Sequence, residues 1–462
     1  MIEKNKDIEL NKMGTMPMGK LMMSMSLPAM FSMIINALYN IIDSIFVGMV
    51  GESALTAVTL IFPVQMLMIA VGVGTGVGLN SLISRRLGER NFKEANLAAN
   101  HGILLSLVNW VVFAVFGLFF SETFVSAFSD SPQIIKDGTS FCFITTVFSL
   151  FLMVQINVEK IMQATGNMVL PMISSLIGAG INIVLNPILI LGLFGAPEMG
   201  VAGSATASII GQFISMTVNL TFLFRKKHDV KIGFRGFKIH GGVLKNIYGV
   251  GLPSIVMQSI GSVMLVGLNA ILIKFSDAAV AVLGIYFRLQ SFIFMPVFGL
   301  TQGSLPIFGY NYGAKNRDRL IQAFKMALKI ALIIMTVGML LFQILPVPML
   351  KMFSASPEMM HIGVRALRMI SPCFIFAAIG IIASTFFQAT GHGTLSLYVS
   401  LLRQLVLILP LAWLLARFLG LDFVWLAFPL AELFSLAASI LFLRYIYEKE
   451  IRNLDNNIGG LK

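Results

Sequence analysis

The chain repeats its own pattern at a spacing of 225 residues (253 minus 28), and this repeat constrains its fold more than any other feature. The longest match is Gln163-Ala164-Thr165-Gly166, which returns in the same register as Gln388-Ala389-Thr390-Gly391. The other matching pairs are Leu27-Pro28 and Leu252-Pro253, Gln65 and Gln290, Gly78 and Gly303, Gly88 and Gly313, Asn91 and Asn316, and Ser131-Pro132 and Ser356-Pro357. Two halves of common origin are expected to place a shared site at the seam between them.

The composition indicates that most of the surface faces lipid. Of the 462 residues, 57% are hydrophobic and 12% are charged, whereas a soluble domain carries about 25% charged residues. Twelve apolar runs are long enough to cross about 30 Å of hydrocarbon, and runs of this length are expected to be helices. These runs are residues 21–49, 54–83, 97–120, 138–163, 168–193, 201–224, 247–274, 279–307, 322–345, 361–388, 394–418 and 422–446. We therefore predict an all-α integral membrane protein with twelve transmembrane helices.

Lys and Arg are distributed unevenly between the two sides of the predicted membrane. If the N-terminus is inside, the inner connections hold basic clusters at 85–93, 225–245 and 315–329, and the outer loops hold few basic residues. Cytoplasmic loops are enriched in Lys and Arg, so both termini are expected in the cytoplasm and the protein in the cell membrane. The same placement explains the net charge of +12 without any binding of nucleic acid.

The number of helices in each half fixes how the halves are related. Six is even, so both halves cross the membrane in the same sense, related by an axis along the membrane normal. We predict two side-by-side six-helix bundles, residues 1–224 and 247–462, the second ending in a short cytoplasmic tail. The segment 225–246, rich in Lys, Arg and Gly, is predicted to be the cytoplasmic linker.

Asp43 is the sharpest candidate for chemistry inside a span, because an ionisable residue in the membrane marks a functional site by default. Asn36, Tyr39 and Asn40 share its helical face and form one polar stripe. A carboxyl group in such a place has to accept a proton or have a cation beside it. That requirement suits coupling to an ion gradient.

A second group of polar residues is expected at the same depth as Asp43. Asn182 and Asn186 lie one turn apart on the fifth predicted helix, and Ser204 and Thr206 lie near the start of the sixth. At about 1.5 Å of rise per residue, these side chains share a layer in the outer half of the first bundle. We predict an ion-coupling site here. A structural network that ties these helices together is the alternative.

Other ionisable residues within spans leave their roles open. Glu159 and Lys160 are adjacent and so do not face each other on a helix. Two interpretations stay open for this pair. In the first, the Lys160 side chain extends to the membrane surface and Glu159 contacts another helix. In the second, the pair has a functional role and Glu159 contacts the cargo. Glu432 is expected to form a buried ion pair with Arg403 or Arg288, and such a pair can have either a structural role or a role in a functional site.

Several residues are candidates for lining a central cavity. Gln65 and Gln290 are amides related by the repeat, and methionines accompany them in both halves. Flexible thioethers and aromatic rings suit varied flat cations, although most of these residues also suit packing. The predicted cargo-binding set is Met33, Asn36, Gln65, Glu159, Met257, Gln290 and Met295.

Motifs for enzymatic and metal chemistry are absent from the sequence. There is no His/Cys cluster with metal-ligand spacing, no Walker or dinucleotide fingerprint, and no constellation of nucleophile and base. We expect no metal, no cofactor, no enzyme activity and no ATPase, so any pumping has to be driven by an ion gradient. Cys142 and Cys373 both lie in apolar runs and are expected to be buried thiols.

Several motifs resemble those of the MATE (multidrug and toxic compound extrusion) transporters, over nearly the whole chain. They are Asn40-Ile41-Ile42-Asp43 with Phe46-Val47-Gly48, Leu87-Gly88-Glu89-Arg90-Asn91, Glu159-Lys160-Ile161-Met162-Gln163-Ala164-Thr165-Gly166-Asn167, Gln290-Ser291-Phe292 and Leu402-Arg403-Gln404. The sequence is most similar to the DinF-like branch. The resemblance implies a MATE/MOP-type fold and an antiporter that exports lipophilic, mostly cationic drugs or dyes against protons or sodium ions. We expect it to act as a monomer.

The resemblance also implies roles for particular residues. The helix 1 aspartate usually couples export to the ion in this branch, and it matches Asp43. The branch often has Asn and Asp on helix 5. Asn182 matches the first, but Asn186 stands where the second carboxylate is expected. The helix 7 acid of other branches is also missing from Met257-Gln258-Ser259. With one negative ligand fewer, proton coupling is favoured over sodium coupling.

Two alternatives to drug export remain open. A lipid or lipid-linked oligosaccharide flippase of the same superfamily would need a strongly cationic cavity to hold phosphate. The interior cations here are offset by Asp43, Glu159 and Glu432. A receptor or structural membrane protein without a transport cycle would not need the internal repeat with its paired glycine-rich helix ends.

Overall fold

The computed structural model describes residues 11–225, 229–233 and 237–454, except for the side chains of Asn40, Ile41 and Ser44. All regular elements in these ranges are helical. In the first part of the chain they are α1 (Lys12–Thr15), α2 (Met18–Val50), α3 (Glu52–Gly88), α4 (Phe92–Ser126), α5 (Pro132–Val147), α6 (Leu150–Ala164), α7 (Val169–Leu191), η1 (Leu193–Gly195) and α8 (Val201–Arg225). They continue as α9 (Gly241–Leu272), α10 (Asp277–Gly313), α11 (Arg317–Ile344), α12 (Pro346–Lys351), α13 (Pro357–Ile370), α14 (Cys373–Ala389), α15 (Gly393–Leu401), η2 (Leu402–Ile408), α16 (Leu409–Leu419), α17 (Leu421–Val424), α18 (Ala427–Ile446) and η3 (Tyr447–Ile451).

The helices reproduce the predicted membrane spans. Within the described ranges, 10 helices are long and apolar enough to cross a membrane, or 12 if each of two bent pairs is one span. The bent pairs are α5 with α6, at 42°, and α13 with α14, at 50°. The two breaks lie at corresponding places in the repeat.

The repeated motifs are helix ends. Asn91 caps α4 by accepting from the backbone N–H of Glu94, and Asn316 caps α11 by accepting from that of Arg319. In the other repeated motif, Gly166 (φ 89°) and Gly391 (φ 93°) follow the ends of α6 and α14 in a conformation that favours glycine. The repeat therefore preserves the turns that set the direction of each helix.

The N-terminal half (α2–α8) and the C-terminal half (α9–α18) meet along a seam formed by α2, α3, α9 and α10. A Cβ atom at Gly88 would collide with the carbonyl oxygen of Tyr310, and one at Gly313 with that of Arg85. Both contacts are between backbones and are related by the repeat. Glycine is therefore required for the helices to approach this closely.

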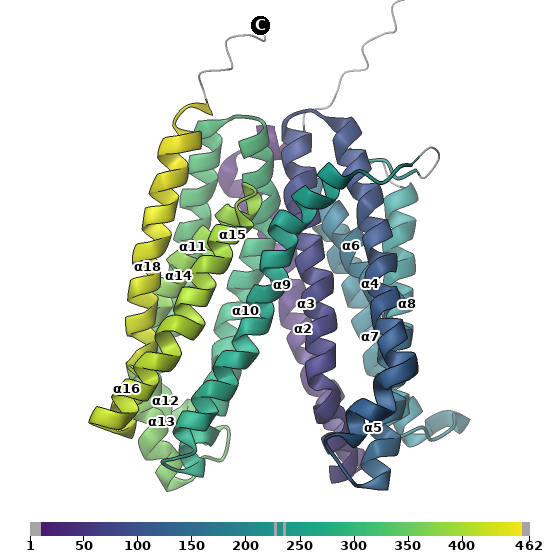
Figure 1. Ribbon diagram of the computed structural model, residues 1–462, viewed down its shortest axis with the longest axis vertical. Coiled ribbons are helices and arrows are strands. Elements are labelled where there is room, and N and C mark those ends of the chain that lie inside the picture. Colours follow the sequence, from purple (N-terminus) through teal and green to yellow (C-terminus); the bar gives the residue numbers. More distant parts are fainter. Residues whose placement is uncertain (1–10, 226–228, 234–236, 455–462) are drawn as a thin grey trace, which may run out of the picture.

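The two groups of helices lean together at one end, at the top of Figure 1, and spread apart toward α5 and α13 at the other. We call the joined end the closed end. There α1 bridges the halves: the Asn11 amide beside it donates to the carbonyl oxygen of Thr165 at 3.0 Å. The carbonyl oxygen of Met13 accepts from Asn311 at 3.2 Å and from Arg319 at 3.1 Å.

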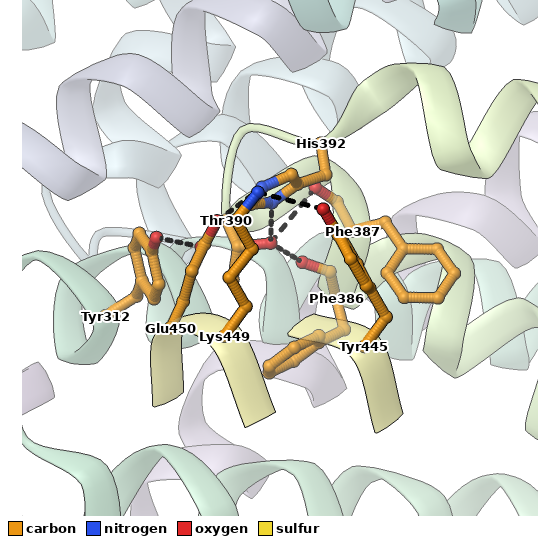
Figure 2. A network of polar contacts seen from close by, with 8 residues as sticks. All are labelled: Tyr312, Phe386, Phe387, Thr390, His392, Tyr445, Lys449 and Glu450. Carbon is orange, nitrogen blue, oxygen red and sulfur yellow. Dashed lines mark hydrogen bonds and ion pairs between the residues drawn. The ribbon is translucent and has the colours of Figure 1, made fainter. Parts of the chain in front are cut away.

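A polar network connects η3 to other helices of the C-terminal half at the closed end (Figure 2). The Tyr312 hydroxyl donates to Glu450 Oε2 at 2.6 Å, and His392 Nε2 lies 3.1 Å from Glu450 Oε1. Thr390 Oγ1 lies 3.1 Å from the other ring nitrogen of His392. Glu450 thus joins η3 to α10 and to the turn between α14 and α15.

Candidate functional site

Asp43 on α2 is held by side chains from two other helices of the N-terminal half. Its Oδ1 accepts from Asn186 Nδ2 of α7 at 2.6 Å and from Ser204 Oγ of α8 at 2.8 Å. Asn186 and Ser204 are both fully buried. The structure therefore brings together three residues that the sequence placed in one layer.

A second polar contact lies one turn away from Asp43. Ser208 Oγ accepts from Asn182 Nδ2 at 3.0 Å and lies 3.0 Å from the Tyr39 hydroxyl. We did not predict Ser208 from the sequence, although its position one turn after Ser204 is a signal that identifies it. The Thr206 hydroxyl donates instead to the carbonyl oxygen of Ala202 at 2.8 Å, which places it outside this network. The side chain of Asn40 lies outside the described residues.

The close approach of α7 and α8 makes these contacts possible. A Cβ atom at Gly178 would lie 2.9 Å from the carbonyl oxygen of Gly211, and one at Gly211 would collide in turn with the backbone of Gly178. The facing glycines let the helices pack backbone to backbone, so short polar side chains reach across.

A cavity of about 450 Å³ lies beside the network, inside the N-terminal half. It is lined from α2, α3, α5, α6, α7 and α8, and of the predicted residues it includes Met33, Asn36, Gln65, Glu159 and Asn182. Tyr39 and Ser208 line one end of the cavity, and Asp43 and Ser204 lie one helical turn beyond them without lining it. Among the described residues that line it, Gln302 of α10 is the one from the C-terminal half.

The predicted residues of the C-terminal half do not line this cavity. Met257, Gln290 and Met295 lie half-buried on α9 and α10, and Met257 Sδ accepts from the Ser396 hydroxyl at 3.3 Å. Their role in binding cargo stays a prediction.

Glu159 and Lys160 lie at the other end of the cavity and face different helices. Glu159 Oε1 accepts from Gln155 at 3.1 Å, from Ser175 of α7 at 3.1 Å and from Asn219 of α8 at 3.2 Å. Contact of Glu159 with other helices is as expected. Of the two interpretations left open for Lys160, the one in which its side chain extends to the membrane surface is wrong, because that side chain is buried.

A third charged cluster lies in the C-terminal half, apart from the cavity. Arg403 Nη1 lies 3.1 Å from Glu432 Oε1, whereas Arg288 is exposed. Of the two arginines that the sequence offered as partners of Glu432, the structure pairs it with Arg403. Arg403 lies in η2, a stretch of π-helix. In the described ranges no three His, Cys, Asp or Glu residues are placed to hold a metal ion.

The chemistry available to the Asp43 cluster follows from its neutral surroundings. Asn186 and Ser204 donate hydrogen bonds but carry no charge, and no cation among the described residues forms an ion pair with Asp43. An uncompensated carboxylate is costly in hydrocarbon. The site is therefore suited to hold an exchangeable proton or a small cation.

Comparison with known proteins establishes the family. The MatE family profile matches residues 28–188 and again residues 253–414, one match in each half of the repeat. The chain belongs to the MatE family. Members of this family are transporters, so the prediction of a multi-pass membrane transporter, and not an enzyme, is confirmed.

Relatives match over most of the chain. The multidrug export protein MepA of Staphylococcus haemolyticus is 26% identical over 414 residues, which cover 89% of this chain and 90% of the relative. MepA of Staphylococcus aureus is 24% identical over 438 residues, which cover 94% of this chain and 96% of the relative.

Solved structures confirm the MATE/MOP-type fold. An outward-facing multidrug resistance MATE family transporter of the MOP superfamily aligns with TM-score 0.89 at 27% identity, over 96% of this chain and 98% of that chain. A MOP superfamily transporter from Pyrococcus furiosus, whose reversed pocket polarity is said to suggest a different function, aligns with TM-score 0.89 at 26% identity. That alignment covers 97% of this chain and 99% of that chain.

Proposed function

We propose that this MatE protein is a secondary active exporter of lipophilic cationic drugs or dyes, driven by entry of protons. The observation that carries the proposal is Asp43, a carboxylate held by two neutral donors one helical turn beyond Tyr39, which lines the cavity. A proton on Asp43 removes the charge that a cationic cargo would otherwise balance. Proton and cargo therefore compete for the same negative charge, which is the basis of exchange.

Proton coupling is preferred to sodium coupling because of Asn186. A hard cation is bound by several oxygen ligands at once, and more tightly when more of them are charged. Asn186 directs its amide N–H at Asp43 and supplies no second carboxylate. Asn182 and Ser204 complete a layer with a single charge, which supports a proton site.

The lining of the cavity suits flat, apolar cations. Met33, Met66 and Phe62 offer adaptable apolar and aromatic contacts, and Asn36 and Gln65 offer amide oxygens. Glu159 adds a carboxylate held by neutral donors. A cavity of about 450 Å³ is within the range of small-molecule sites.

Transport requires the seam to open and close. We propose that two bundles, residues 1–224 and 247–462 joined by the linker 225–246, rock about the seam in the cell membrane, with both termini in the cytoplasm. The closed end would then face the cytoplasm and the cavity would communicate with the outside. Met257, Gln290 and Met295 would contact cargo when the seam opens inward. The protein is proposed to work as a monomer.

A flippase for an anionic lipid is the second candidate, favoured by one observation: Lys160 lines the cavity. A single ammonium beside Glu159 is a weak phosphate site compared with a cluster of cations. Cation export is therefore the better reading.

Ethidium efflux from vesicles containing the purified protein tests the proposal. A proton gradient alone is expected to drive efflux, a sodium gradient alone is not, and Asp43→Asn is expected to abolish the proton-driven part. Asp130→Asn, which removes an exposed loop carboxylate, is the matched control. Efflux driven by sodium alone would contradict the proton assignment. Movement of a fluorescent anionic lipid without dye efflux would favour the flippase.

A further inference from the structure

Lys160 is the one cationic side chain among the described residues that line the cavity, and the proposed exchange does not use it. It is 7% exposed, and its Nζ donates to Gln163 Oε1 at 3.0 Å and to Gln302 Oε1 at 3.1 Å. Both acceptors are neutral amides, and in the described part of the chain no carboxylate forms an ion pair with Lys160. A buried ammonium without an ion pair is costly, so its presence calls for a function.

The fold makes room for this side chain in one half only. A Cβ atom at Gly76 of α3 would lie 2.6 Å from Lys160 Cγ, so the absence of a side chain at Gly76 accommodates the stem of Lys160. The repeat counterparts of Gly76 and Lys160 are Thr301 and Thr385. The cation and the space for it thus occur together in the first half and are both missing from the second.

Among the residues that the structure describes, three charged side chains lie in the cavity lining or next to it. Glu159 lines the cavity and accepts hydrogen bonds from side chains of α6, α7 and α8. Asp43 lies one helical turn beyond the lining residue Tyr39, and Lys160 lines the cavity and donates to Gln302 of α10. With both acids ionised, these groups sum to one negative charge. A cargo with one positive charge brings the total charge to zero, and a cargo with two positive charges leaves one positive charge in excess.

We propose that Lys160 is a specificity-determining residue that restricts the cargo to compounds carrying a single positive charge. This inference rests on the proposed export of cations. A second charge on the cargo would meet the Lys160 ammonium with no carboxylate left to balance it. The repulsion between the two cations is stronger in a poorly hydrated cavity than in water, because the effective dielectric constant is lower.

Two dyes with the same ring system test the inference: ethidium, which has one positive charge, and propidium, which has two. Their dissociation constants would be measured by fluorescence anisotropy on the purified full-length protein, and their efflux would be measured from vesicles. The variants are Lys160→Gln, which removes the charge, and Lys160→Arg, which keeps it. Lys325→Gln on the exposed face of α11 is the control. The thermal unfolding temperature of each variant reports on folding.

We expect the original protein and Lys160→Arg to prefer ethidium. Lys160→Gln is expected to tighten propidium binding by about tenfold or more relative to ethidium, which is the effect of about 1.4 kcal/mol. An unchanged ratio of the two constants in a folded Lys160→Gln protein would overturn the inference while leaving cation export intact. An equal change in Lys160→Gln and Lys160→Arg would also overturn it, because shape and not charge would then decide. If the original protein binds neither dye, the proposed function fails together with the inference.

Discussion

Replacing Gly88 or Gly313 with alanine is expected to weaken the closed end of the seam. A methyl group at either position overlaps a backbone carbonyl oxygen of the facing helix, at Tyr310 or at Arg85. A backbone atom cannot rotate away as a side chain does, so the helices have to separate. Overpacking of this kind costs about 1–3 kcal/mol. If that cost falls on the closed conformation alone, its population relative to the open one falls by about 5- to 150-fold.

The assay is the accessibility of one engineered thiol in the seam. Ser304 is fully buried there, so Ser304→Cys in a protein without Cys142 and Cys373 should react slowly with a water-soluble maleimide. Adding Gly88→Ala or Gly313→Ala is expected to raise the labelling rate in proportion to the open population. Gly284→Ala on α10 is the matched control, because a Cβ atom there meets nothing within 4 Å. Labelling rates equal to that control would refute the steric argument.

Three further outcomes are expected. Arg403→Met should lower the free energy of unfolding by about 3–5 kcal/mol, because it leaves Glu432 buried and unpaired. The double variant Arg403→Met/Glu432→Leu removes both charges and should have nearly the stability of the original protein. Thermal unfolding of both variants measures the difference. Tyr312→Phe removes the hydrogen-bond donor to Glu450 and should destabilise the attachment of η3 by about 1–3 kcal/mol. Native-state proteolysis of the η3 segment measures this, and a cleavage rate equal to that of the original protein would count against the network. Asn186→Asp supplies a second carboxylate beside Asp43 and should make ethidium efflux respond to a sodium gradient. If efflux by this variant does not change with sodium, the residues around Asp43 do not select the coupling ion.

The elements that were predicted correctly from the sequence depend on local patterns. The apolar runs identified the spans because each helix has to satisfy its own backbone in lipid. Asp43, Asn186 and Ser204 were placed in one layer because helical rise converts position in the sequence into depth, and the structure joins them directly.

What the sequence did not predict depends on contacts between distant helices. Lys160 is buried because Gly76 on another helix makes room for it and Gln302 of the other half accepts from it. The cavity lies within the N-terminal half and not symmetrically across the seam, because α3 packs directly against α9 and α10. These features follow from how the halves approach one another, which a repeat in the sequence does not specify.

Proton release on cargo binding tests the central claim most directly. Ethidium would be added to the purified protein in a weakly buffered solution, and the protons released per dye bound would be counted with a pH indicator. The proposed exchange predicts release in the original protein, and a loss of most of that release in Asp43→Asn with the Asp130→Asn control unchanged. Dye binding without proton release, or equal release in Asp43→Asn and the original protein, would contradict the claim that proton and cargo compete for the charge of Asp43.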